Sequence, residues 1–204
     1  MERTRILVVE DNIDEASYLR DALTMLDYTV AGTVLSGEEA LLRISQDPPP
    51  DLILMDILLE GAMDGIEAAE KIHAESSIPI IYLTAHDEEE LLQRARMTEP
   101  FGFLLKPFSN HELHSTIEIA LYKHMMEKKL KESEERYSSI FNATTDALFL
   151  TDRNMKVIDA NQQACRMYGY TRKELLGSDF VELTAPAWRD RFRQHLQEVL
   201  DTRS

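Results

Sequence analysis

Apolar residues gather in five short runs along the first half of the chain, and each run has the length and the β-branched content of a buried strand. Segments with helical spacing separate the runs. In the first of them, Ala16, Leu19 and Leu23 recur at intervals of three and four residues. Unbroken apolar strands that alternate with helices indicate a parallel sheet covered on both faces. We therefore expect a doubly wound α/β domain with strands at residues 5–10, 29–34, 51–56, 79–84 and 101–106.

A long helix is expected next. Residues 110–137 contain no proline or glycine and are rich in Lys and Glu. Their apolar residues, Leu113, Ile117 and Ala120 followed by Met126 and Leu130, fit a heptad repeat imperfectly. The pattern leaves two alternatives open, a coiled coil between two copies of the chain and a solvated spacer.

The pattern of apolar and polar residues changes after this helix. Residues 147–152 and 156–161 have the pattern of two strands joined by a polar turn, and short helical segments that end at glycines follow them. We expect an α/β domain over residues 1–124, a helical linker over 125–136 that continues its last helix, and a smaller α+β domain over 137–204.

The acidic charge is confined to the first domain. Residues 1–124 hold 9 Lys and Arg against 24 Asp and Glu, whereas residues 125–204 hold 13 of each. Such a surface repels phosphate backbones and anionic lipids, so neither nucleic acid nor a membrane is an expected partner. The single cysteine, Cys165, excludes an internal disulfide, and the sequence has no signal peptide and no apolar run of about 18 residues. We expect a cytoplasmic protein.

Polar side chains follow the apolar runs at their carboxyl ends. The first run ends in Glu10 and Asp11, the third in Asp56, the fourth in Thr84 and the fifth in Lys106. In a doubly wound sheet these ends lie at one edge, near the point where the strand order reverses. The five side chains are therefore expected to converge.

Three carboxylates close together raise one another's pKa unless a cation is present. Mg²⁺ suits the site because it prefers oxygen ligands and retains several waters. The ion would also neutralise an incoming phosphoryl group, so that Asp56 could act as a nucleophile toward phosphorus. Lys106 would bind one phosphoryl oxygen, and the Thr84 hydroxyl would donate to another.

These residues resemble the receiver domain of response regulators in two-component signalling. The resemblance covers residues 3 to about 123, and its motifs are VVEDN (8–12), LILMD ending in Asp56, the pair Asp64 and Gly65, YLTA (82–85) and LLKPF (104–108). It implies a flavodoxin-like fold. It also implies that Asp56 accepts a phosphoryl group from a sensor histidine kinase or a phosphotransfer protein.

The resemblance assigns the other roles as well. Thr84 and Phe103 would be switch residues, and Lys106 would contact the phosphoryl group. The implied Mg²⁺ ligands are Asp11, Asp56, the backbone carbonyl of Leu58 and, through a water, Glu10.

The loop after Asp56 departs from the family pattern. Many receivers have a Met-Pro pair there, whereas this chain has Gly61 in place of the proline and one extra residue before Asp64. Leu58 and His86 flank the acceptor and would influence the attacking water, which Leu58 cannot orient. We therefore expect slow loss of the phosphoryl group.

Residues 134–200 resemble the first part of a PAS domain, through ERYSSIFNATTDALFLTD and VIDANQQACRMYGYTRKELLG. PAS domains have five strands, and only two are recognisable here. We expect an incomplete sheet that is less stable than the first domain.

The favoured interpretation is a phosphorylation switch without further catalytic activity, which relays its signal through the long helix to the PAS-like segment and forms a homodimer through that helix. One alternative is the N-terminal fragment of a hybrid sensor histidine kinase. A phosphatase of the haloacid dehalogenase type is disfavoured, because it needs an Asp two residues after the nucleophile and this chain has Leu58. No glycine-rich nucleotide motif follows the first strand.

Overall fold

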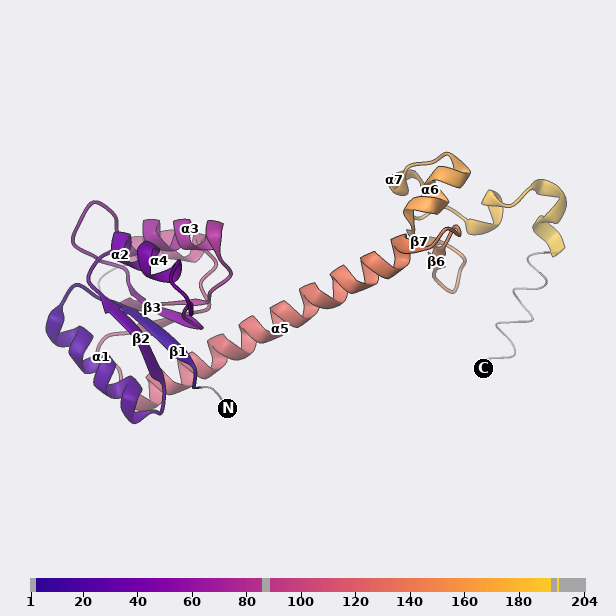
Figure 1. Ribbon diagram of the computed structural model, residues 1–204. Helices are drawn as coiled ribbons and strands as arrows, with labels where there is room; N and C mark the ends of the chain where they lie inside the picture. The colour runs from indigo at the N-terminus through magenta and orange to yellow at the C-terminus, as the bar shows by residue number, and fades with distance from the viewer. Residues whose placement is uncertain (1–2, 86–88, 192–193, 195–204) are drawn as a thin grey trace. The chain divides into compact units, whose positions relative to one another are not determined.

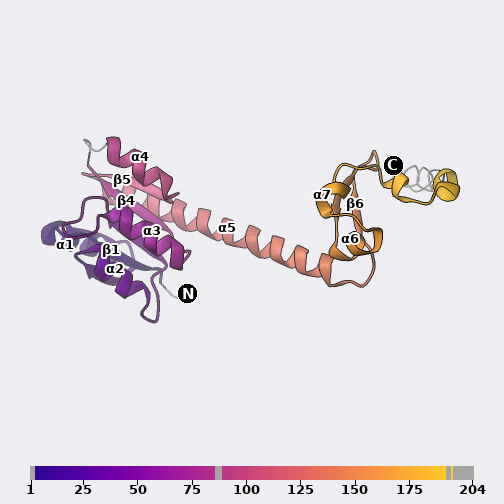
Figure 2. The ribbon, with the colours of Figure 1, turned by 90° about the horizontal axis from the view of Figure 1, so that it is seen from above.

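The computed structural model describes residues 3–85, 89–191 and 194 (Figure 1). Contacts divide the chain into two compact units, residues 1–129 and residues 130–204. Helix α5 (Asn110–Ala143) begins in the first unit and ends in the second, and it is one continuous helix (Figure 1, Figure 2).

The described part of the first unit contains a five-stranded parallel sheet of order β2-β1-β3-β4-β5. The strands are β1 (Arg5–Val9), β2 (Thr29–Val34), β3 (Leu52–Asp56), β4 (Ile80–Thr84) and β5 (Gly102–Leu105). Every residue of β3 and β4 is buried, because helices cover both faces of the sheet. The predicted doubly wound fold is confirmed.

Alternate side chains along each strand pack against different helices. On one face, α1 (Ile13–Met25) and the start of α5 cover a cluster that includes Ile6, Val8, Leu52, Leu54, Leu19 and Leu113. On the other face, α2 (Gly37–Ile44), α3 (Gly65–Glu75) and α4 (Glu89–Met97) cover a cluster that includes Leu7, Val9, Ile53, Met55, Ile44 and Ile72.

The strand order places the polar strand ends together. Strand β1 lies between β2 and β3, so the direction of chain winding reverses at β1. The residues that follow β1 and end β3 therefore flank the reversal point, where open α/β sheets place their ligands.

The second unit has a smaller core. Strands β6 (Phe149–Thr151) and β7 (Val157–Ala160) pair in antiparallel fashion. Helices α6 (Gln162–Tyr168) and α7 (Arg172–Leu175) and the 3-10 turns η1 (Phe180–Leu183) and η2 (Pro186–Trp188) follow. Among the residues of this unit that the structure describes, the fully or nearly fully buried apolar side chains are Val157, Ala160, Ala164, Leu175 and Val181. Helix α6 ends at Gly169, whose φ of 75° is left-handed, as its glycine predicts.

Candidate functional site

Three of the side chains predicted to converge do meet at the carboxyl edge of the sheet. The Lys106 ammonium, just after β5, lies 2.5 Å from Oδ2 of Asp56 and 2.7 Å from Oε2 of Glu10. Asp56 ends β3, and Glu10 follows β1. Both carboxylates are nearly buried, so a single ammonium group compensates two charges that would otherwise be costly to bury.

Glu15, which the sequence reasoning missed, also contacts this lysine. Its Oε2 lies 2.5 Å from the Lys106 ammonium. Asn12 caps α1 by accepting hydrogen bonds from the backbone N–H groups of Asp14 and Glu15, which fixes the first turn of the helix beside the site. The signal in the sequence was that Glu15 lies in the first turn of the helix that directly follows Glu10 and Asp11.

The carboxylates form a compact set of oxygen donors. Among the described residues, Glu10, Glu15 and Asp56 each offer an oxygen within 4.8 Å of the other two. Burial raises the pKa of Glu10 to about 7, the charge of Asp56 acts in the same direction, and the hydrogen bond from Lys106 opposes both. These hard oxygen ligands fit Mg²⁺, which would supply the positive charge that one lysine cannot.

Lys106 is held in its charged form. Burial acts to lower its pKa, but the hydrogen bonds to Asp56, Glu10 and Glu15 outweigh burial, so the pKa lies above its usual value. The site therefore contains a permanent ammonium group in contact with the strand-end carboxylate.

Asp11 is not part of the compact set formed by Glu10, Glu15 and Asp56. Its Oδ2 accepts a hydrogen bond of 2.8 Å from the Glu60 backbone N–H, in the loop after β3. In the same loop, the Leu58 backbone N–H donates to Oδ1 of Asp56 at 2.8 Å, and the Leu58 side chain is exposed. Both Asp56 oxygens thus have a protein donor, Leu58 on one and Lys106 on the other.

Thr84 is the last residue of β4, and Phe103 lies in β5, the neighbouring strand at the edge of the sheet. Thr84 is buried, and its hydroxyl donates to the Ala85 carbonyl at 3.2 Å. Phe103 is half-buried with its ring centroid 5.7 Å from that of Tyr82. The predicted influence of His86 falls outside the described residues.

Two glycines explain the loop between β3 and α3. Gly61 has a φ of 142°, a conformation that side-chain-bearing residues rarely adopt, so glycine stands where many receivers have proline. Gly65 begins α3 so close to the strand that an added Cβ would lie 1.8 Å from the Asp56 carbonyl oxygen. Its N–H donates to the Ile57 carbonyl at 3.0 Å, and Asp64 caps the helix.

A hollow of about 440 Å³ opens beside Lys106. Its lining residues are Glu15, Tyr18, Leu19, Ala85, Lys106, Pro107 and Phe108. The hollow therefore connects the acidic site with an apolar surface on α1 and on the segment before α5.

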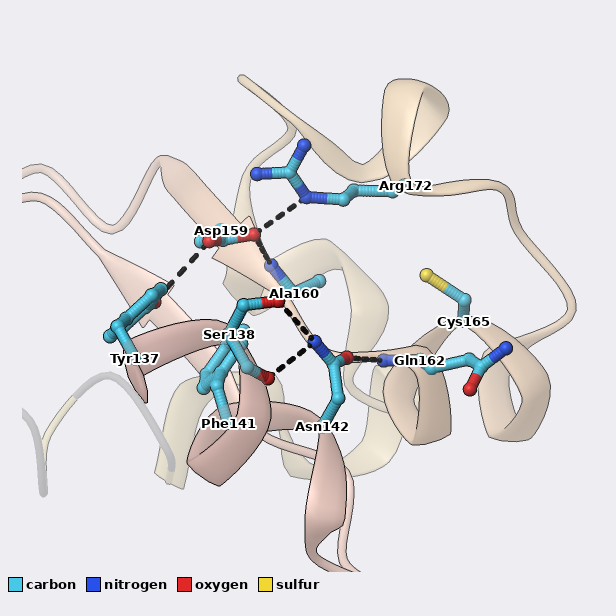
Figure 3. Close-up of a pocket in the computed structure, with 9 residues that line it drawn as sticks. All are labelled: Tyr137, Ser138, Phe141, Asn142, Asp159, Ala160, Gln162, Cys165 and Arg172. Atoms are coloured by element: carbon cyan, nitrogen blue, oxygen red, sulfur yellow. Dashed lines mark hydrogen bonds and ion pairs between the residues drawn. The ribbon is translucent and has the colours of Figure 1, made fainter. Parts of the chain in front are cut away.

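The second unit contains a larger hollow of about 730 Å³ at the end of α5 (Figure 3). Its charged groups are already paired, because Arg172 contacts Asp159 at 2.7 Å and the Tyr137 hydroxyl donates to Asp159. Asn142 accepts from the Gln162 backbone N–H. We assign no ligand to this hollow.

Comparison with known proteins identifies both parts of the chain. Residues 6–118 match the response regulator receiver domain, and residues 135–203 match a PAS domain. The chain belongs to the response regulator receiver family, as its motifs predict. It is a signalling protein that joins a receiver domain, a long helix and a PAS domain.

Individual relatives include a kinase and a regulator. The sensor histidine kinase TmoS of Ectopseudomonas mendocina is 28% identical over 98% of this chain, which spans 24% of TmoS. The transcriptional regulatory protein PdtaR of Mycobacterium tuberculosis is 34% identical over 57% of this chain, and the match spans 56% of PdtaR. The chain thus spans 24% of TmoS and 56% of PdtaR.

A solved structure shares the fold of the first unit. The signal receiver domain of a modulated diguanylate cyclase from Desulfovibrio desulfuricans is 41% identical, with a TM-score of 0.58, and the match covers 62% of this chain and 99% of that one.

Within the described residues, no helix is long and apolar enough to cross a bilayer.

Proposed function

We propose that this protein is a two-component response regulator that accepts a phosphoryl group on Asp56. The observation that carries the proposal is the contact between the Asp56 carboxylate, at the end of a buried strand, and the Lys106 ammonium, which also binds Glu10. A carboxylate with a fixed ammonium partner, next to further oxygen donors, can attack phosphorus while the charge of the phosphoryl oxygens is neutralised.

The donor would be a phosphohistidine of a sensor histidine kinase or of a phosphotransfer protein. A carboxylate oxygen of Asp56 forms a bond to phosphorus, and the bond from phosphorus to the imidazole nitrogen of the donor breaks. The imidazole leaves as a neutral ring, because its other nitrogen already carries a proton. Lys106 then exchanges its contact with the carboxylate for one with a phosphoryl oxygen. The hollow beside Lys106 gives the donor a route to the site.

Magnesium belongs to the proposal. The residues that would hold it are Glu10, Asp11, Asp56 and the Leu58 carbonyl, and the position of Glu15 adds a further carboxylate. When bound, the ion would supply positive charge to the phosphoryl oxygens.

The phosphorylated site would act on the surrounding structure through Thr84 and Phe103. The Thr84 hydroxyl would turn from the Ala85 carbonyl to a phosphoryl oxygen, and Phe103 would move inward. The change would pass along α5 to the PAS domain in a homodimer joined through that helix. The proposal includes a cytoplasmic location and neither nucleic acid nor membrane as partner.

A second candidate is that this chain is part of a hybrid sensor histidine kinase. The observation that favours it is the match to TmoS, which extends over 98% of the chain and so includes both domains. Phosphoryl transfer to Asp56 would be an internal step of such a protein. A phosphatase remains disfavoured, because Leu58 replaces the second Asp that it needs.

Labelling tests the proposal directly. Incubation of the full chain with acetyl phosphate and Mg²⁺ should produce an acid-stable, base-labile adduct, detected by intact mass. Asp56→Ala should abolish it, whereas Asp51→Asn, on an exposed residue just before the same strand, should not. Equal labelling of wild type and Asp56→Ala would refute the proposal.

The phosphoryl group should be lost slowly from Asp56, with a half-life of many minutes, because Leu58 cannot orient the attacking water. A half-life of seconds would contradict this expectation.

A further inference from the structure

Helix α5 carries two apolar stripes. The first consists of Leu113, Ile117 and Ala120, which are fully buried against the sheet. The second, which we call the outer stripe, consists of Ile119, Tyr122, Met126 and Leu130. At about 100° per residue, the centres of the two stripes lie on nearly opposite sides of the helix.

The outer stripe is an exposed apolar surface. The exposed fractions of its side chains are 66% for Ile119, 61% for Tyr122, 39% for Met126 and 62% for Leu130. Four large apolar side chains in one row, with charged residues on both sides, are typical of an interaction surface rather than of isolated surface residues.

The spacing of the outer stripe is regular. Its members follow one another at intervals of three, four and four residues, so that Leu130 lies eleven residues after Ile119. Three helical turns over eleven residues correspond to about 3.67 residues per turn, close to the value of a straight α-helix, so the four side chains lie on one face. The apolar residues of this helix fit a single heptad repeat imperfectly because they belong to two different faces.

The charged residues on the two sides of the outer stripe complement those of a second copy of this chain. Glu118 and Lys129 lie on one flank of the stripe, and Lys123 and Glu134 lie on the other. In two parallel helices in register, a residue just before a core position faces the residue five positions further along the other helix. Glu118 would then face the partner's Lys123, and Lys129 would face the partner's Glu134, with opposite charges in both pairs.

We propose that the outer stripe binds the outer stripe of a second copy of this chain, with the two α5 helices parallel and in register. The inference rests on the homodimer of the proposed function and names its interface. It does not depend on phosphoryl transfer, because the stripe is exposed without any change at Asp56. The tests therefore use unphosphorylated full chain, and Asp56→Asn should dimerise as wild type does.

Sedimentation equilibrium tests the interface. Wild type should be a dimer, and Leu130→Lys should raise the dimer dissociation constant by about 100-fold, since it places two ammonium groups in the interface. The matched control is Leu42→Lys on α2, where the leucine is similarly exposed at 70%, and it should leave the constant unchanged. A monomeric wild type, or equal effects of the two substitutions, would overturn the proposal.

Charge reversal and cross-linking test the orientation. Lys129→Glu should weaken the dimer by about tenfold, and addition of Glu134→Lys should restore it. In a Cys165→Ser background, Leu130→Cys should form an interchain disulfide under mild oxidation, whereas Glu135→Cys, on the opposite side of the helix, should not. Failure of the charge rescue, or cross-linking only at position 135, would overturn the parallel in-register arrangement even if phosphoryl labelling of Asp56 succeeds.

Discussion

Replacement of Gly65 by alanine should damage both the stability of the first unit and the acceptor site. The added Cβ would lie 1.8 Å from the carbonyl oxygen of Asp56, 2.9 Å from its carbonyl carbon and 3.2 Å from the Ile57 Cα. Carbon atoms in ordinary contact lie about 3.5–4.0 Å apart. Because all three neighbours are backbone atoms, no rotamer change relieves the overlap, and the start of α3 must move away from β3.

The magnitude follows from two losses. Movement of α3 stretches the hydrogen bond from the Gly65 N–H to the Ile57 carbonyl, now 3.0 Å, which contributes about 0.5–1.5 kcal/mol. Overpacking of a tightly packed site costs about 1–3 kcal/mol. The gain of about 0.4–1 kcal/mol from a less flexible unfolded chain offsets part of this. We expect the free energy of unfolding of the first unit to fall by about 2–3 kcal/mol, a large share of the roughly 5–15 kcal/mol typical of domains.

Urea denaturation followed by far-UV circular dichroism measures this loss. The matched control is Gly32→Ala, whose added Cβ would meet only side-chain atoms, at 3.3 Å for Arg43 and 3.4 Å for Leu7. These side chains can shift, so we expect a loss under about 1 kcal/mol. Gly65→Ala should also slow labelling of Asp56, because the overlap is with the backbone of the acceptor residue itself. If Gly65→Ala proves as mild as the control, the steric reasoning is wrong.

Three further substitutions test other contacts. Asn161→Ala should destabilise the second unit by about 2–4 kcal/mol, because the buried side-chain amide of Asn161 makes hydrogen bonds with four backbone groups. The urea midpoint of the Trp188 fluorescence transition measures this loss. Glu15→Gln should weaken Mg²⁺ binding by about threefold to tenfold in calorimetric titration, since one carboxylate of the cluster is lost, and unchanged affinity would argue against its role. Tyr28→Phe removes hydrogen bonds to His114 and Glu118 and should cost the first unit about 1–2 kcal/mol, and an unaltered urea midpoint would contradict this.

The sequence alone was sufficient for the architecture of the first unit. Continuous apolar runs such as that of β3 are typical of strands buried on both faces, and the structure buries every residue of that strand. The same reasoning located the strand ends, so Glu10, Asp56 and Lys106 could be expected to meet. Parallel strands bring their carboxyl ends to one edge whatever the detailed packing.

Contacts between distant elements required the tertiary structure. The contact of Glu15 with Lys106 joins residues 91 positions apart and depends on how the first turn of α1 lies relative to the segment that follows β5. Asp11, a predicted metal ligand, accepts a hydrogen bond from the Glu60 backbone N–H, because the loop after β3 comes within hydrogen-bonding distance of its carboxylate.

The outer stripe of α5 shows the same division between sequence and structure. Periodicity relates residues within one helix, but it does not say which of two apolar faces the sheet will cover. Packing buries the face of Leu113 and leaves the face of Leu130 exposed. The sequence by itself determined which elements form and where their polar ends lie, whereas the tertiary structure decided which side chains meet, because contacts depend on the mutual packing of elements far apart in the chain.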